Sequence, residues 1–294
     1  DGEALNYTGA TANDAHVATA NKYIDAITLT NDTGLASNYA KPTLNNANAP
    51  VTINAATLTP TLTNAGTTKT YDGSTNAPGG FTPTYSFTGF ATGDTNATLA
   101  NTSAVYNDKD VADANKVTVG GISITNITGS NSSAATDYVL NATSKDVAAT
   151  ITAKTVGLSA IKTYDGTKDL SGKVTVTTGI DGEALNYTGA TANDAHVATA
   201  NKYIDAITLT DGTGTAGNYA KPTLNNANAP VTINAATLTP TLTNEGVTKV
   251  YDGTTSAPGG FSPAYSFAGF VTGDTSATLA NTSAVYNDKD VADA

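Results

Sequence analysis

The stretch FTPTYSFTGF, residues 81–90, returns as FSPAYSFAGF at residues 261–270, and the differences between the two copies indicate the fold. Three threonines of the first copy become serine or alanine in the second: Thr82, Thr84 and Thr88. The residues between them do not change: Phe81, Pro83, Tyr85 and Phe87. Successive residues of a strand face opposite sides of a sheet, so the unchanged aromatic face is expected to point inward and the threonine face to point to solvent. The stretch is therefore a predicted strand with one buried face.

The same alternation occurs in KVTVGGISIT, residues 116–125, and in KVTVTT, residues 173–178, and it predicts half-buried antiparallel strands. Turn residues separate these runs, which favours an all-β chain with little helix. NDAHVATANKYIDAI, residues 13–27, has a spacing that is compatible with a helix, but its counterpart at residues 107–124 ends in a strand pattern. Related segments share structure, so we expect a loop followed by a strand in residues 13–27 and in their copy at 193–207.

The chain repeats itself. Residues 1–114 align without a gap on residues 181–294, and 100 of these 114 positions are identical, so the period is 180 residues. Within one period the tripeptide Tyr-Asp-Gly recurs at spacings of 93 and 87 residues, which indicates that a long and a short module alternate. We place the boundaries in four parts: residues 1–53 as the C-terminal part of a short module, 54–151 as a complete long module, 152–233 as a complete short module and 234–294 as the N-terminal part of a long module.

Modules of 80 to 100 residues can each bury one modest core. Their length and turn spacing fit an Ig-like β-sandwich of about seven strands. The sequence therefore predicts a tandem array of such sandwiches that forms an elongated rod. A smaller β-grasp-like module is the alternative fold.

Composition excludes several partners. The 294 residues carry a net charge of −11, and all 14 basic side chains are lysines, which argues against nucleic acid and anionic membranes as partners. Cysteine is absent, which excludes a disulfide-held scaffold and zinc sites built on cysteine. No apolar run approaches the ~20 residues that a membrane-spanning helix needs. The absence of Cys and Met, which oxidise, favours an extracellular location.

Few residues offer catalytic chemistry. His16 and His196 are the only histidines, they occupy one repeated position, and we interpret them as exposed loop residues. The sequence has three glutamates and no phosphate-binding GxxxxGK[ST] loop. We therefore expect no enzyme activity and no organic cofactor.

An acidic run, YNDKDVADAN, is the one candidate metal site. Its carboxylates could offer oxygen ligands to Ca²⁺ and recur 180 residues later: Asp108, Asp110, Asp113, Asp288, Asp290 and Asp293. The run lacks the residue order of a calcium-binding EF-hand loop and contains Lys109. A solvated turn is the favoured interpretation, with calcium binding as the alternative.

The repeated tripeptide is predicted to be a structural turn. It comprises Tyr71, Asp72 and Gly73, then Tyr164, Asp165 and Gly166, then Tyr251, Asp252 and Gly253. An aspartate can accept a hydrogen bond from the backbone two residues on, and a glycine can adopt positive φ, so the pair specifies a tight turn. The tyrosine is expected to pack at a corner of the module and to direct its hydroxyl at a backbone group.

Four segments together resemble the YDG domain family. They are the KxYDG[ST] motif near the start of a module, TGD at residues 92–94 and 272–274, YNDKDVADANKVTVGGISIT at 106–125 and ATDYVLNATSKDVAATITAKTV at 135–156. YDG repeats occur in large secreted bacterial surface proteins, including filamentous-haemagglutinin-like adhesins that are exported by two-partner secretion. The resemblance implies a secreted, cell-surface location and no catalytic residues.

The resemblance also implies a stalk that holds an adhesive tip away from the cell, with neighbouring repeats of the same chain as its partners. One alternative is a fibre that assembles laterally through exposed edge strands. A second is a repeat that itself binds glycans or host proteins, which would need an exposed aromatic platform. We interpret the tyrosines that could supply one as core or corner residues instead: Tyr7, Tyr39, Tyr71 and Tyr106.

Overall fold

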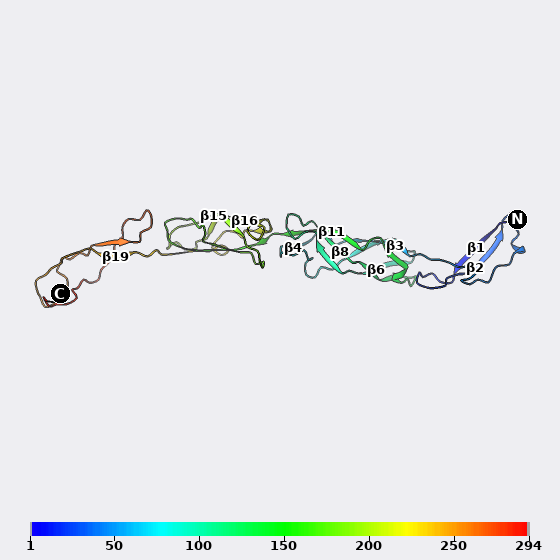
Figure 1. Ribbon diagram of the computed structural model, residues 1–294, viewed down its shortest axis with the longest axis horizontal. Helices are drawn as coiled ribbons and strands as arrows, with labels where there is room; N and C mark the ends of the chain where they lie inside the picture. Colours follow the sequence, from blue (N-terminus) through cyan, green and yellow to red (C-terminus); the bar gives the residue numbers. More distant parts are fainter. Residues whose placement is uncertain (1, 293–294) are drawn as a thin grey trace. The chain divides into compact units, whose positions relative to one another are not determined.

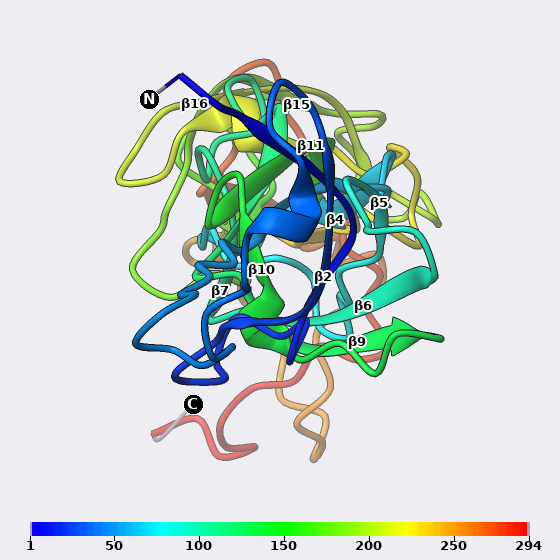
Figure 2. The same ribbon diagram turned by 90° about the vertical axis from the view of Figure 1, so that its right-hand side faces the viewer.

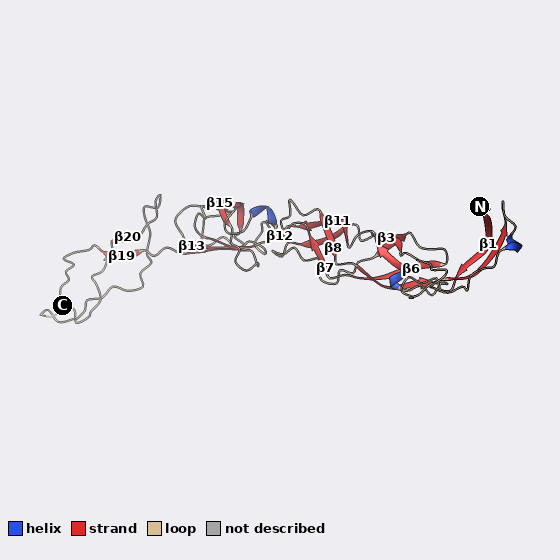
Figure 3. Ribbon diagram, turned by 45° about the vertical axis from the view of Figure 1, so that its right-hand side comes forward, coloured by secondary structure: helices blue, strands red, loops and turns tan. Residues whose placement is uncertain are grey.

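The computed structural model describes residues 2–292, and the chain divides into two compact units, residues 1–152 and 153–294. The described residues are all-β with almost no helix, as the colours of Figure 3 show. Within residues 2–292, no helix is long and apolar enough to cross a membrane. The all-β prediction is therefore confirmed.

The first unit begins with a hairpin and continues into the long module (Figure 1). The hairpin and the short 3-10 helix after it are β1 (Leu5–Ala12), β2 (Ile24–Asn31) and η1 (Ala36–Asn38). The long module contains β3 (Ala56–Leu62), β4 (Thr67–Thr70), β5 (Tyr85–Thr88), β6 (Asp94–Ala100), β7 (Ser103–Tyr106), β8 (Lys116–Gly120), β9 (Ser123–Gly129), η2 (Ala135–Asp137), β10 (Tyr138–Leu140) and β11 (Ser144–Thr152).

The long module is built from three sheets. Their strand orders are β10-β3-β5, β4-β11-β8-β7 and β6-β9. Figure 2 shows the antiparallel pair of β6 and β9 side by side. Two pairs are parallel, β3 with β10 and β4 with β11, so strands from the start of the module pair with strands from its end. This pairing closes the module, because residues more than 80 positions apart hold its two ends together.

The core of the long module follows the predicted alternation. One cluster packs Leu58, Ala97, Ile127 and Tyr138 against partly buried residues that include Phe87 and Phe90. The rings of Phe90 and Tyr138 meet edge to face at 5.8 Å. Val117 and Val119 of β8 are fully buried, whereas Thr82, Thr84 and Thr88 face solvent. The assignment of the aromatic face to the inside is therefore confirmed.

The second unit contains the short module followed by residues 234–292. Its elements are β12 (Lys154–Thr155), β13 (Gly157–Thr163), β14 (Val174–Thr177), β15 (Asn186–Ala192), β16 (Ile204–Thr210), η3 (Ala216–Asn218), β17 (Tyr219–Ala220), β18 (Val231–Asn234), β19 (Thr239–Leu242) and β20 (Tyr265–Ala268). The pairs are β14-β13-β18, β12-β17, β15-β16 and β19-β20. Here too an early strand pairs in parallel with a late one, β13 with β18 and β12 with β17.

Two local predictions concern these loops and strands. Residues 13–23 form a loop that leads into β2, and residues 193–203 form the same loop before β16, so the choice of loop and strand over helix is confirmed. The runs at 116–125 and 173–178 form β8, β9 and β14, which pair antiparallel as expected. The parallel pairs were not predicted, and they depart from the all-antiparallel sheets of an Ig-like sandwich.

Candidate functional site

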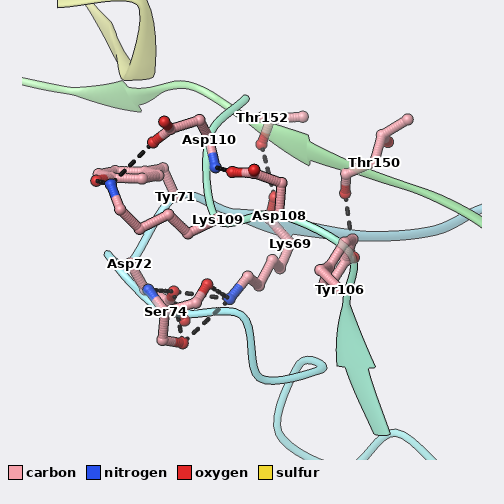
Figure 4. Close-up of polar contacts among 10 residues, drawn as sticks. All are labelled: Lys69, Tyr71, Asp72, Ser74, Tyr106, Asp108, Lys109, Asp110, Thr150 and Thr152. Carbon is pink, nitrogen blue, oxygen red and sulfur yellow. Dashed lines mark hydrogen bonds and ion pairs between the residues drawn. The ribbon is translucent and has the colours of Figure 1, made fainter. Parts of the chain in front are cut away.

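The Tyr-Asp-Gly turn of the long module is held by a buried lysine (Figure 4). Asp72 Oδ1 accepts hydrogen bonds from the backbone N–H of Ser74 at 2.9 Å and from the ammonium of Lys69 at 2.7 Å. The same ammonium donates to the backbone oxygen of Ser74 at 2.7 Å and lies 5.4 Å from the ring centre of Tyr106. Gly73 has a φ of +77°, in the left-handed region that glycine adopts without strain.

The lysine occupies the same place in all three copies of the motif. Lys162 Nζ lies 2.6 Å from Asp165 Oδ1 and donates to the backbone oxygens of Thr167 and Asp169, both at 2.9 Å. Lys249 Nζ lies 2.8 Å from Asp252 Oδ1. The Lys-x-x-Asp-Gly spacing therefore lets one ammonium replace water as the donor to two or three oxygens of a tight turn.

The aspartates of these turns are held in the charged form. Burial opposes ionisation of Asp165, but the hydrogen bonds from Lys162 and Thr167 outweigh it and lower its pKa to about 2. Hydrogen bonds from Lys249 and Thr254 likewise lower the pKa of Asp252 to about 2. A carboxylate with such a low pKa is a poor general base at neutral pH, so the arrangement is suited to stabilising a turn.

Tyr71 lies where the long module closes. Its backbone N–H donates to the oxygen of Thr152 at 2.8 Å, directly beyond the parallel pair of β4 and β11. The short module repeats this contact between Tyr164 and Asn234, at the end of β13 and β18. The turn thus lies beside the boundary at the end of its own module, whereas its position in the sequence indicated only the start of a module.

The acidic loop folds over the same tyrosine. The ammonium of Lys109 lies 5.7 Å from the ring centre of Tyr71 and donates to its hydroxyl at 3.4 Å (Figure 4). Tyr71 is 1% exposed. The structure therefore joins two motifs that the sequence presented separately, and Lys109, which counted against a metal site, is the residue that joins them.

The carboxylates of the acidic loop do approach one another. Ligand atoms of Asp108, Asp110 and Asp113 lie within 4.8 Å of each other. Asp108 accepts a hydrogen bond from the backbone of Asp110, whose own carboxylate accepts one from Lys109. Carboxylate oxygens of Asp108 and Asp110 therefore already accept hydrogen bonds from the protein, and one of the donors is the charged Lys109.

The solvated turn stays the prediction and calcium binding its alternative, and a calorimetric titration with CaCl₂ distinguishes them. In the second copy Asp290 pairs with Lys289 at 2.8 Å and its backbone donates to Asp288. Asp293 lies outside the described residues.

The two histidines differ, although their surroundings in the sequence are identical. His196 is an exposed loop residue, as expected, with 72% of its side chain accessible. His16 is 33% accessible, because its Nδ1 lies 2.7 Å from Asp137 Oδ2 of the long module. The interpretation of His16 as an exposed loop residue was therefore wrong, since a residue 121 positions away covers it.

The tyrosines divide in a similar way. Tyr71 and Tyr106 are buried as expected, but Tyr7 is 63% exposed and Tyr39 is 47% exposed. Tyr187, the counterpart of Tyr7 in the second copy, is half-buried. Its hydroxyl accepts a hydrogen bond from the backbone N–H of Val174 in β14 at 2.9 Å. Residues 1–53 contain no counterpart of β13 and β14, so the interpretation of Tyr7 and Tyr39 as core residues fails for this copy.

The comparison with protein families places a known domain in the first unit. Residues 54–145 match the model of the YDG domain. This YDG domain contains the Tyr-Asp-Gly turn, the acidic loop and Asp137, and it ends within β11. No curated protein matches the chain, and no solved structure matches it. The resemblance to the YDG domain is thus confirmed for residues 54–145.

Sequence reasoning missed the lysine of the YDG turn. It was visible in the repeat, because lysine stands three residues before the aspartate in all three copies: Lys69, Lys162 and Lys249. Lysine is rarely buried without a partner, so its fixed spacing from an aspartate was a usable signal. The contact between His16 and Asp137 had no such signal, because nothing in the local pattern pairs residues so far apart.

Proposed function

We propose that the chain is a structural repeat region, the stalk of a bacterial cell-surface adhesin that projects an adhesive tip towards a cell surface, a host or a biofilm matrix. The observation that carries the proposal is the repeat itself. A 180-residue period with 100 of 114 compared positions identical is suited to a linear array that gains length by adding modules. The motif that recurs with each module is a turn held by a lysine, which supports a mechanical role for the recurring residues.

The proposal includes a location and an architecture. We place the chain outside the cell, in a filamentous-haemagglutinin-like adhesin exported by two-partner secretion. We further propose that its modules form a rod of sandwiches that are Ig-like in size but carry parallel strand pairs. The YDG domain at residues 54–145 supports the family context. The net charge of −11 would keep neighbouring stalks soluble and apart.

Two alternatives have specific observations in their favour. Val139 on the edge strand β10 is 51% exposed, which favours lateral assembly into a fibre. The exposure of Tyr7 and Tyr39 favours a repeat that binds glycans or host proteins. Both observations are confined to a single strand or to residues 1–53, so the stalk remains the better supported function.

Imaging of the purified chain at rising concentration tests the three functions. A stalk gives discrete elongated particles, on the order of 100 Å long if each module adds the length of a ten-residue strand, and their length does not change with concentration. A fibre-former elongates as the concentration rises. Compact particles in small-angle scattering would contradict the stalk, and saturable binding to a glycan array by the repeat alone would favour the binding repeat.

A further inference from the structure

The loop that carries His16 is held together by its own hydrogen bonds. The ammonium of the buried Lys22 donates to the backbone oxygens of Val17 and Thr19. Asn13 closes the loop by exchanging hydrogen bonds with the backbone of Tyr23, at 3.0 and 2.8 Å. We call residues 13–23, and their copy 193–203, the His loop.

The copy has the same construction. Lys202 is buried and donates to Val197 and Thr199, and Asn193 closes the loop on Tyr203 at 3.0 and 2.9 Å. The left-handed residue of the loop also repeats, with a φ of 57° at Asn21 and 56° at Asn201. The fold of the His loop therefore does not depend on what it contacts.

In the first unit, the His loop is docked on the long module. Asp137, in η2, accepts a hydrogen bond from the backbone N–H of Val17 at 2.6 Å, and its other oxygen lies 2.7 Å from the imidazole of His16. The side chain of Asp137 is only 11% accessible, and it also accepts a hydrogen bond from the backbone of Ala134. The contact thus joins the His loop, which has its own internal hydrogen bonds, to the carboxylate of Asp137. That carboxylate is itself held by the backbone of Ala134 in the turn that carries it.

In the second unit, the same loop has no such turn against it among the described residues. His196 pairs with Asp194 of its own loop at 3.2 Å, and Val197 is 42% exposed. The two loops share their sequence and the hydrogen bonds of their lysine and asparagine, but His16 pairs with Asp137, whereas His196 pairs with Asp194 and lies 6.4 Å from the ring of Tyr164. The occupant that the exposed loop fits is the segment that covers its twin, the Asp137-bearing turn of a long module.

We propose that the His loop of a short module is a docking element for the Asp137-bearing turn of a long module. We call this contact the joint, and protonation of the histidine strengthens it. The inference concerns the joint itself and holds whether or not the chain acts as a stalk. Its recurrence every 180 residues would give an array a series of pH-sensitive joints.

The charges around His16 set the direction of the effect. Asp137 faces it from η2, Asp14 from its own loop and Asp94 from β6, and the hydrogen bond with Asp137 contributes most to raising the pKa of His16 above 6.5. Burial alone would raise the pKa of Asp137, but the hydrogen bonds from His16, Val17 and Ala134 lower it below 3.8.

The sign of the pH dependence follows from these two directions. A raised histidine pKa means that the ion pair is complete below pH 6.5 and is lost as the pH rises through the raised value. A lowered aspartate pKa means that the pair is complete above pH 3.8 and is lost as the pH falls through the lowered value. The joint is therefore tightest between these limits and loosens as the pH rises through the raised pKa of His16.

The experiment uses the full 294-residue chain. NMR titration of the two histidines is direct, because the chain has only His16 and His196. We expect Asp137→Asn to lower the pH at which His16 titrates and to leave the His196 signal unchanged. The matched control is Asp146→Asn, which removes an exposed carboxylate of the same module that pairs with Lys116 and leaves His16 unchanged.

A second measurement reads the joint itself. The chain lacks cysteine, so cysteines for spin labels can be introduced at chosen sites. Labels at Thr8→Cys in β1 and Ser86→Cys in β5, both exposed positions, report the distance between the β1–β2 hairpin that carries the His loop and the long module. We expect a narrower distance distribution at pH 5.5 than at pH 8.5, and no pH dependence in Asp137→Asn. If Asp137→Asn unfolds the long module, His16→Gln removes the same ion pair from the loop side. Equal distributions at both pH values, or an unchanged His16 titration in the variant, would overturn the proposal.

Discussion

Residues 54–114 and 234–294 are two copies of one sequence, identical at 51 of 61 positions; the structure describes the first together with residues 115–152, which form β8 to β11, and the second up to residue 292 without such a segment. The Lys–Asp contact of the YDG turn is 2.7 Å in one copy and 2.8 Å in the other. The hairpin of β3 and β5 keeps its register in β19 and β20, with Pro60 opposite Phe87 and Pro240 opposite Phe267. These elements therefore form from local sequence.

Other features differ between the copies. Tyr71 is 1% exposed and Tyr251 is 57% exposed. Leu62 is 7% exposed, whereas its counterpart Leu242 is 53% exposed. Residues 94–100 form β6, but residues 274–280 form no strand. Burial and the strands β4, β6 and β7 thus require the second half of the module, in particular the parallel pairing of β11 with β4.

The largest expected difference concerns the tyrosine of the turn. Tyr71→Ala removes a buried ring and should destabilise the long module by about 3–5 kcal/mol, while Tyr251→Ala should change stability by no more than about 0.5 kcal/mol. Hydrogen exchange of peptides from residues 54–152 and 234–292 in increasing urea measures both. Equal effects of the two substitutions would show that the burial of this tyrosine does not depend on residues 115–152.

The lysine of the turn should show a smaller difference. Lys69→Met removes the ammonium that donates to the backbone oxygen of Ser74 and to the carboxylate of Asp72, which then keeps only its hydrogen bonds from Ser74, and this should cost about 2 kcal/mol. Lys249→Met should cost about 1 kcal/mol or less, because the side chain of Lys249 is already 14% accessible against 5% for Lys69. Denaturant unfolding of both variants checks this, and a larger loss for Lys249→Met would contradict it.

Gly73→Val tests whether the turn is structural. Gly73 has a φ of +77°, so a β-branched residue there should cost at least about 1–2 kcal/mol. The loss should be confined to the long module and should leave the exchange of residues 153–233 unchanged. A loss of ligand binding with unchanged melting would instead assign the turn to a binding site.

The smallest expected effect is that of acid on the YDG turn of the short module. The pKa of Asp165 is lowered to about 2 by Lys162 and Thr167 against the effect of burial, so its contribution to stability is complete above pH 3.8 and is lost as the pH falls towards 2. The melting temperature of the short module should be flat down to about pH 4 and fall below it. Asp165→Asn should be less stable at neutral pH and lack that part of the decline; a wild-type decline centred above pH 4 would contradict the assignment.

Much of the secondary structure could be predicted from the sequence, and the long-range contacts could not. The alternation at Phe81 to Phe87 gave the buried face, because period-two patterning depends only on neighbouring residues. The pairing of β4 with β11 joins Lys69 to Ile151, and no local pattern specifies such a register. The contacts of Lys109 with Tyr71 and of His16 with Asp137 could not be predicted for the same reason. The lysine of the YDG turn was missed although its spacing was visible.

We infer that residues 115–152 complete the fold that the Tyr-Asp-Gly turn begins. The most direct measurement is hydrogen exchange on the chain extended after residue 294 with the sequence of residues 115–152. We predict that residues 234–292 then gain the protection of residues 54–114, with Tyr251 as protected as Tyr71. Protection of residues 234–292 that stays unchanged after the extension, or that already equals that of residues 54–114 before it, would contradict the claim.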